Sequence, residues 1–270
     1  MVIVNWSVGK REGIAPSIAY HTACSADLQL RESEIALFGP DTLLLFDIDG
    51  TLLGGMPPTH RQAICEAIFQ FFGQTITPEE ITHTAGRTDT AIVYHILEQR
   101  GISRTAITPL FPALFEAMAA AYQRLRPADL RAFVLPSVAE TLRWLEQRQA
   151  ALGLVTGNLT AIAWSKLSAA GIAHYFQCGA FGEEAEARDT LPALAASRAR
   201  ECFGRAFRPD HTFVIGDTPF DIACGVACGF RTIAVATGRF HSFEELDGHR
   251  PDFLLRDLSE LPALDALLNA

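Results

Sequence analysis

An uninterrupted apolar run that ends at two carboxylates constrains this chain more than any other feature. Residues 43–53 read Leu-Leu-Leu-Phe-Asp-Ile-Asp-Gly-Thr-Leu-Leu, so Asp47 comes directly after four apolar residues and Asp49 follows two residues later. Such a short apolar run is typical of a strand buried in a parallel sheet. Residues two apart on an extended chain project to the same side, and ligands of open α/β sheets bind outside the carboxyl ends of the strands. The pair therefore predicts a metal site, a nucleophile with an acid/base partner, or both.

Strand and helix patterns alternate along the second half of the chain. We expect strands at residues 152–155, 178–181, 212–215, 232–236 and 253–254, with helices between them and at the end. Ser137 with Glu140 and Ser242 with Glu245 have the spacing of capping boxes, which mark helix starts. This alternation predicts an α/β protein with a doubly wound, mainly parallel sheet.

Residues 55–133 carry helical patterns without intervening strands. One apolar stripe of Ala63, Ile64, Ala67, Ile68 and Phe71 predicts a first helix, and Thr77-Pro78 predicts the start of a second. Further helices are expected over residues 89–99 and 109–125. We therefore predict a core of residues 41–54 and 134–270, an inserted all-helical unit of residues 55–133, and an N-terminal extension of residues 1–40 without sustained periodicity.

Charge and composition exclude several classes of protein. The net charge of −9 and the pI near 5.4 argue against a nucleic-acid-binding surface, which is usually basic. No apolar run approaches the roughly 18 to 20 residues that cross a bilayer. The six scattered cysteines lack the spacing of a zinc site, and we expect them to be reduced. These features predict a cytoplasmic protein that binds neither nucleic acid nor membrane; they leave its oligomeric state open.

Polar residues follow two further predicted strands. Thr156-Gly157-Asn158 comes after the strand at 152–155, with Lys166 on the next helix, and Gly216-Asp217 comes after the strand at 212–215, with Asp221 one helical turn later. A strand that leads into a helix N-terminus is suited to bind phosphate. Taken singly, Asp49-Gly50 could be a turn, Asp217 a helix cap and Lys166 a solvated lysine. Their joint occurrence in this order favours a common site.

These motifs resemble those of a known superfamily. Asp47-x-Asp49-Gly-Thr51, Thr156-Gly157-Asn158, Lys166 and Gly216-Asp217-x-x-x-Asp221 are similar, in order and spacing, to the four motifs of the haloacid dehalogenase superfamily. The resemblance extends from about residue 43 to the end of the chain and implies a Rossmann-like sheet. It also implies Mg²⁺-dependent phosphoryl transfer. The helical insertion takes the place of the C1-type cap of the phosphoglycolate-phosphatase-like branch.

The resemblance also implies a role for each motif residue. Asp47 would be the nucleophile, and Asp49 would protonate the leaving oxygen and later activate water. Asp47, the backbone carbonyl of Asp49, and Asp217 would bind Mg²⁺, with Asp221 holding a metal-bound water and Thr51 orienting Asp47. Thr156, Gly157, Asn158 and Lys166 would bind the phosphate. Superfamily members that dehalogenate lack the second carboxylate, so Asp49 favours phosphoryl transfer.

The expected substrate is a small phosphorylated metabolite, and the expected activity is that of a phosphatase. A phosphomutase of the β-phosphoglucomutase type would share every motif residue and differ only in what accepts the phosphoryl group. A non-catalytic phosphate-binding module is a further alternative, which the complete set of motifs disfavours.

Two polar stretches outside the motifs have two interpretations each. Gly86-Arg87-Thr88-Asp89 precedes an apolar helix, so Thr88 or Asp89 is expected to cap that helix, whereas Arg87 is a candidate to contact the leaving group. The polar run at residues 183–189 is expected to be a solvated loop rather than part of the entrance. His60 and His95 have no recognisable partner and are expected to be ordinary helix residues.

Overall fold

The computed structural model describes residues 37–82 and 84–268. The N-terminal extension predicted for residues 1–40 therefore lies outside the described residues except for its last four. Among these, Phe38 is fully buried and packs edge-on against Phe213, with a ring separation of 5.2 Å. The last residues of the predicted extension thus belong to the core.

A six-stranded parallel sheet lies at the centre of the fold, with strand order β3-β2-β1-β4-β5-β6. Its strands are β1 (Leu43–Phe46), β2 (Ala151–Val155), β3 (Cys178–Ala180), β4 (Thr212–Gly216), β5 (Arg231–Val235) and β6 (Phe253–Leu255). β1 is central, with Leu43 in register with Ala151 of β2 and with Thr212 of β4. The predicted doubly wound parallel α/β sheet is confirmed.

Helices cover both faces of the sheet because alternate residues of each strand point to opposite sides. Leu44 and Phe46 pack with α5 (Val138–Gln147), α6 (Thr160–Ala169) and α10 (Leu261–Leu268). Leu43 and Leu45 pack with α7 (Leu191–Phe203) and α8 (Pro219–Ala227), and α9 (Phe243–Gly248) lies beside β6. The short 3₁₀ turns are Thr108–Leu110, Arg131–Phe133, Ala173–Tyr175, Arg188–Thr190, Pro209–His211 and Leu258–Glu260.

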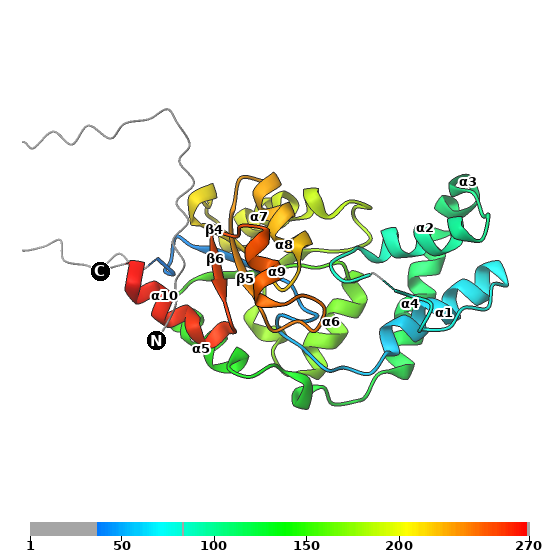
Figure 1. Cartoon of the computed structure of the whole chain (residues 1–270), viewed down its shortest axis with the longest axis horizontal. Helices are drawn as coiled ribbons and strands as arrows, with labels where there is room; N and C mark the ends of the chain where they lie inside the picture. The colour runs from blue at the N-terminus through cyan, green and yellow to red at the C-terminus, as the bar shows by residue number, and fades with distance from the viewer. Residues whose placement is uncertain (1–36, 83, 269–270) are drawn as a thin grey trace, which may run out of the picture.

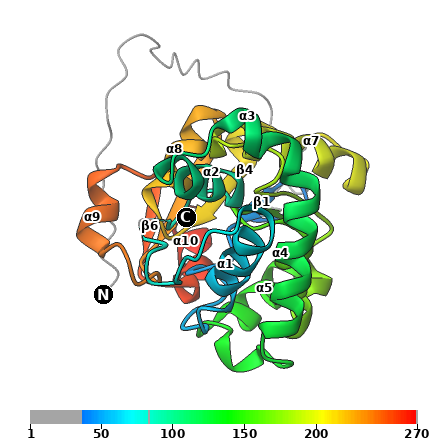
Figure 2. The same ribbon diagram turned by 90° about the vertical axis from the view of Figure 1, so that its right-hand side faces the viewer.

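The helical insertion after β1 forms one end of an elongated molecule, and α10 lies at the other end (Figure 1). It contains α1 (Thr59–Phe72), α2 (Asp89–Gln99), α3 (Arg104–Ile107) and α4 (Phe111–Leu125), which face the viewer in Figure 2. These helices share an apolar cluster of their own, which Leu159 and Ile162 at the start of α6 join. The chain leaves and re-enters the sheet layer at one place, where Leu53 bridges Val134. The division into core and cap domains stays a prediction.

One predicted helix start and one predicted capping interaction are wrong. Thr77-Pro78 begins a single turn, in which the Thr77 amide donates to Glu80 Oε1 at 2.8 Å. The turn does not continue into a helix at residues 81–82, and Ile81 is buried in the apolar cluster. Ser137 has a left-handed backbone with φ of 67° and makes no capping bond, although α5 begins at Val138 as expected. The capping box of Ser242 and Glu245 is confirmed.

Within residues 37–82 and 84–268, no helix is long and apolar enough to cross a membrane.

Candidate active site

Three buried carboxylates gather where two central strands end side by side. Asp47 follows β1, and Asp217 follows the adjacent β4, with Asp221 in the first turn of α8. The order of the sheet reverses between β1 and β4, which is where open α/β sheets bind ligands. Oxygen atoms of the three side chains lie within 4.8 Å of one another.

The buried carboxylates disfavour one another's charge. Burial, together with the charges of Asp221 and Asp49, raises the pKa of Asp47 despite the opposing charge of Arg188. Burial and the charges of Asp47 and Asp221 likewise raise the pKa of Asp217. A cation among these oxygens would remove the repulsion, so the chemistry of this donor set fits a hard divalent metal such as Mg²⁺.

Arg188 is a buried cation at this site that the sequence analysis missed. Its Nη2 donates to Asp47 Oδ1 at 2.9 Å, to Asp221 Oδ1 at 2.5 Å and to the Val155 carbonyl at 2.9 Å. Its Nη1 donates to the Gly86 carbonyl at 3.1 Å, while its Nε has no partner among the described residues. Glu184 and Glu186 are exposed as expected for residues 183–189, but the prediction of a solvated loop is wrong for Arg188. Its position after the end of β3 was the available signal, because strand ends converge on the site.

Lys166 is buried and paired with Asp49. Its Nζ lies 2.8 and 2.6 Å from the two carboxylate oxygens of Asp49, and 2.6 Å from Oδ1 of Asn158. Burial acts to raise the pKa of Asp49, but the charge of Lys166 and the hydrogen bonds from Lys166 and Asn158 lower it overall. Lys166 therefore favours the ionised form of Asp49. The plainer interpretation of Lys166 as a solvated lysine is excluded.

The loop after β2 lies against Asp49. Thr156 is fully buried, and its Oγ1 accepts from the Asn158 side chain at 2.6 Å. The same amide donates to Asp49 Oδ2 at 2.8 Å. The predicted phosphate-binding residues thus lie together beside Asp49, and all four line one cavity, namely Thr156, Gly157, Asn158 and Lys166.

Two expected contacts are replaced by others. Thr51 donates to Asp217 Oδ1 at 3.2 Å, so the expectation that it orients Asp47 is wrong. Asp221 Oδ2 accepts from the Thr218 amide at 3.0 Å and from its hydroxyl at 2.6 Å, which forms a capping box at the start of α8. Arg188 donates to the other oxygen, Oδ1. Asp221 does not line the cavity, whereas Asp47 and Asp217 do. Gly50, with φ of 97°, makes the tight turn that the sequence predicts.

The insertion docks on the loop after β2 through His60 and Asp89. His60 Nε2 lies 3.1 Å from Asp89 Oδ2, which also accepts from the Leu159 amide at 2.9 Å. The Asp89 amide donates to the Gly157 carbonyl at 2.8 Å. His60 Nδ1 is 3.4 Å from Lys166 Nζ, so His60 is not an ordinary helix residue. Thr88 caps α2, as expected, by accepting from the Ala91 amide at 3.1 Å.

Backbone contact makes this docking close. A Cβ atom at Gly157 would overlap the carbonyl oxygen of Arg87, and one at Gly182 would overlap the carbonyl oxygen of Gly157. Only glycine therefore allows the three backbone segments to stack.

A cavity of about 810 Å³ opens above these residues. We call the mostly buried part of its lining the floor, made by Asp47, Asp49, Thr156, Lys166 and Asp217. We call a more exposed part of its lining the mouth, made by Arg61, Arg87, Phe220, Arg239 and Phe240. Arg87, the predicted leaving-group contact, belongs to the mouth.

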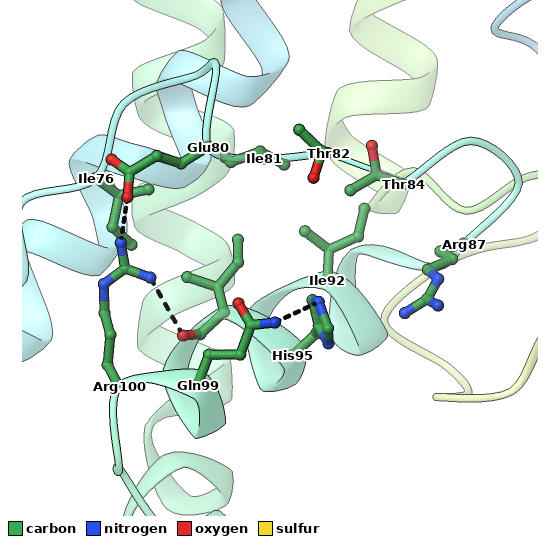
Figure 3. A pocket seen from close by; sticks show the side chains of 11 residues that line it. Ile76, Glu80, Ile81, Thr82, Thr84, Arg87, Ile92, His95, Gln99 and Arg100 are labelled. Carbon is green, nitrogen blue, oxygen red and sulfur yellow. Dashed lines mark hydrogen bonds and ion pairs between the residues drawn. The ribbon is translucent and has the colours of Figure 1, made fainter. Parts of the chain in front are cut away.

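A second cavity of about 410 Å³ lies within the insertion and shares Arg87 with the first. Figure 3 shows Arg87 at one edge and the Glu80–Arg100 pair, 2.8 Å apart, at the other. His95 pairs with Gln99 at 3.1 Å between them. Glu80 is the single carboxylate lining this cavity among the described residues, and Arg100 neutralises it. The second cavity therefore lacks the carboxylate cluster of the first.

Comparison with known proteins gives one family. The family model of the haloacid dehalogenase-like hydrolases matches residues 42–229. Phosphoglycolate phosphatase of Pseudomonas putida is 23% identical over 222 residues, covering 81% of this chain and 78% of the relative. Pyrophosphatase PpaX of Bacillus pumilus is 26% identical over 233 residues, covering 82% of this chain and 94% of the relative.

Solved structures share the fold. β-Phosphoglucomutase from Clostridium difficile superposes with a TM-score of 0.61 at 16% identity, over 82% of this chain and 92% of that one. A hydrolase from Pseudomonas syringae gives a TM-score of 0.59 at 19% identity, over 83% of this chain and 98% of that one. At such identities these similarities speak for the fold alone.

Proposed function

This chain belongs to the haloacid dehalogenase-like hydrolases, and from that premise we propose that it is a Mg²⁺-dependent phosphatase of small phosphorylated metabolites. The observation that carries the proposal is the floor of the cavity. There Asp47 and Asp217 are buried and lie close together. Asp49 lies beside them and forms an ion pair with Lys166. This arrangement provides a nucleophile, a separate proton carrier and a concentration of positive charge at one place.

Asp47 and Asp49 take different roles in the proposed reaction. A carboxylate oxygen of Asp47 attacks phosphorus, the bond from phosphorus to the ester oxygen breaks, and Asp49 gives that oxygen a proton. Water then attacks the aspartyl-phosphate and passes a proton to Asp49, which releases inorganic phosphate and restores Asp47. Lys166 and Arg188 support this difference, since one cation contacts Asp49 and the other contacts Asp47.

The first step requires a protonated Asp49, whereas Lys166 favours the ionised form. A bound phosphate offers new oxygens to the Lys166 ammonium group and to Asn158, both of which contact Asp49 in this structure. We infer that phosphate binding weakens these contacts and lets Asp49 take up the proton. Asp49 is then ready as an acid only when substrate is in place.

Asp47, the backbone carbonyl of Asp49, and Asp217 would hold Mg²⁺, whose charge would stabilise the anionic phosphoryl group during transfer. Both oxygens of Asp221 are already engaged, by Arg188 and by Thr218. This supports the assignment of Asp221 to the surroundings of the metal rather than to direct coordination.

Phosphate contacts are proposed for Thr156, the Gly157 amide, Asn158 and Lys166, because they line the cavity beside Asp49. Arg87 is proposed to contact the leaving group. Its side chain belongs to the mouth, and it has no carboxylate partner in the described part of the chain.

Phosphate release by the purified full chain tests the proposal. We expect Mg²⁺-dependent hydrolysis of p-nitrophenyl phosphate that EDTA abolishes and added Mg²⁺ restores. Asp47→Asn should lower kcat by a factor on the order of 10⁴ or more, because it replaces the nucleophilic carboxylate by an amide of nearly the same size. Robust hydrolysis by this variant, or by the wild type in EDTA, would refute the mechanism. Incubation with a sugar 1-phosphate, followed by detection of the 6-phosphate, separates mutase from phosphatase chemistry.

A further inference from the structure

The mouth of the cavity exposes two aromatic rings to solvent. Phe220 is 42% exposed and Phe240 is 63% exposed, although large apolar side chains are usually covered. In the described part of the chain five large apolar side chains are this exposed, and these two line the same cavity. Exposed apolar surface concentrated at a cavity entrance indicates a binding surface.

Both rings belong to segments whose backbone lies close to Asp217. Phe220 follows Asp217 by three residues, in the first turn of α8. Phe240 follows Gly238 by two residues, and a Cβ at Gly238 would overlap the Asp217 carboxylate. Thr237 donates its hydroxyl to the Gly50 carbonyl at 2.6 Å, which ties this loop to the turn after Asp49. The backbone of each segment therefore lies close to Asp217, and both rings line the cavity.

The charged groups of the mouth are cationic and lack carboxylate partners. Within residues 37–82 and 84–268, Arg61, Arg87 and Arg239 form no ion pair, and the guanidinium of Arg239 lies 5.3 Å from the ring centre of Phe240. Guanidinium groups stack on planar ligands and donate hydrogen bonds to paired acceptor atoms. The mouth thus offers stacking surfaces and hydrogen-bond donors to the leaving group of the substrate.

The cavity is larger than a very small leaving group requires. Cavities of roughly 300 to 1,000 Å³ enclose ligands of drug size, and this cavity measures about 810 Å³. A two-carbon acid such as glycolate would contact the floor and leave both aromatic rings in water. A leaving group with a planar ring, separated from the phosphate by a spacer, would fill it.

We propose that the substrate is a nucleoside 5′-monophosphate, whose base stacks at the mouth against Phe240 and Phe220; this rests on the phosphatase function proposed above. Asp47 attacks phosphorus, the bond from phosphorus to O5′ breaks, and O5′ takes a proton from Asp49. The nucleoside leaves, and water hydrolyses the aspartyl-phosphate to inorganic phosphate. A guanine base presents O6 and N7 as adjacent acceptors, the pair that a guanidinium group binds.

A matched pair of substrates tests the proposal on the full chain with Mg²⁺. Guanosine 5′-monophosphate and ribose 5-phosphate carry the same sugar and phosphate and differ in the base. We expect kcat/KM for guanosine 5′-monophosphate to exceed that for ribose 5-phosphate and for 2-phosphoglycolate by a factor on the order of ten or more, which is the usual contribution of base stacking. Equal or better hydrolysis of either smaller substrate overturns the inference and leaves the phosphatase function standing.

Variants locate the effect. Phe240→Leu should lower the ratio of kcat/KM for guanosine 5′-monophosphate to that for ribose 5-phosphate by a factor of about ten. Phe69→Leu is the control, because Phe69 is 58% exposed on α1 and does not line the cavity. A ratio that Phe240→Leu leaves unchanged, or that Phe69→Leu lowers equally, overturns the assignment of the base to the mouth. Absence of phosphate release from every substrate, p-nitrophenyl phosphate included, overturns the proposed function and this inference together.

Discussion

The floor and the mouth of one cavity differ in how completely their polar groups are partnered. At the floor, Lys166 contacts Asp49, Asn158 and His60, and Arg188 contacts Asp47 and Asp221. At the mouth, among the described residues, the guanidinium groups pair with no carboxylate and two aromatic rings face water. The floor is organised before any ligand arrives, as electrostatic catalysis requires. The mouth lacks ion pairs of this kind among the described residues. Changes at the floor should therefore affect every substrate alike, and changes at the mouth should discriminate between substrates.

Asp49→Asn is expected to have the largest effect. It should lower kcat by a factor on the order of 10³ for every phosphate ester, because it removes the proton carrier. p-Nitrophenolate leaves without a proton, so with p-nitrophenyl phosphate the variant should accumulate phosphoenzyme, which intact-protein mass spectrometry detects. Asp210→Asn, an exposed carboxylate paired with Arg208, is the matched control and should leave kcat unchanged. Loss of Mg²⁺ binding without phosphoenzyme would mean that the Asp49 side chain is a metal ligand.

Arg188→Met should act on stability as well as on activity. It leaves the buried carboxylates of Asp47 and Asp221 without their cation, which is expected to lower the free energy of unfolding by about 3 to 5 kcal/mol in EDTA. Urea denaturation measures this change. Mg²⁺ should restore part of the loss, because it supplies charge to the same oxygens, and Arg188→Lys should lose less. A variant as stable as the wild type in EDTA would mean that these contacts contribute little.

Arg87→Ala probes the mouth. We expect KM to rise by a factor of about ten for a substrate with an anionic or acceptor-rich leaving group, with kcat nearly unchanged, since one charged hydrogen bond is lost outside the reacting centre. Steady-state kinetics on two substrates that differ in the leaving group would measure this selectivity. Arg208→Ala, which lies outside the cavity, is the control. Unchanged kinetics for the best substrate would remove Arg87 from the site.

The smallest effect concerns pH and the metal. The pKa values of Asp47 and Asp217 are raised in the folded chain, so the fold retains protons that the unfolded chain has released. Their contribution to stability is lost as pH rises through the raised pKa values, and the metal-free protein should be less stable at about pH 8 than at about pH 5.5. Mg²⁺ competes with these protons, so the increase in Tm that it produces should be larger at the higher pH. Equal increases at both pH values would contradict this coupling.

The residues at the strand ends could be predicted from sequence because apolar runs reveal buried strands and the fold brings their carboxyl ends together. Asp47, Asp49, Thr156, Lys166 and Asp217 therefore came to one cavity as expected, whereas their catalytic roles stay predictions. The α/β class and the helical insertion followed from the alternation of patterns. These are properties of local sequence and of sheet topology.

Contacts between distant segments were not predictable. Arg188 and His60 became functional candidates only when the structure placed them against Asp47 and Lys166, because no local pattern names the partner of a lone cation or histidine. Thr51 was assigned to the wrong carboxylate, since Asp47 and Asp217 are adjacent in space and far apart in sequence. The failed capping interaction of Ser137 depended on a backbone angle that its residue type does not determine.

The contact between Gly157 and Arg87 has a consequence for how the specificity of such a protein can change. The insertion rests on Gly157 through the carbonyl oxygen of Arg87, and every amino acid supplies the same carbonyl. The side chain at position 87 therefore takes no part in this backbone contact. Under the role proposed for Arg87, substitutions at this position are expected to change leaving-group selectivity without displacing the insertion, whereas any side chain added at Gly157 would displace it. Position 87 can therefore vary among amino acids, whereas position 157 must stay glycine.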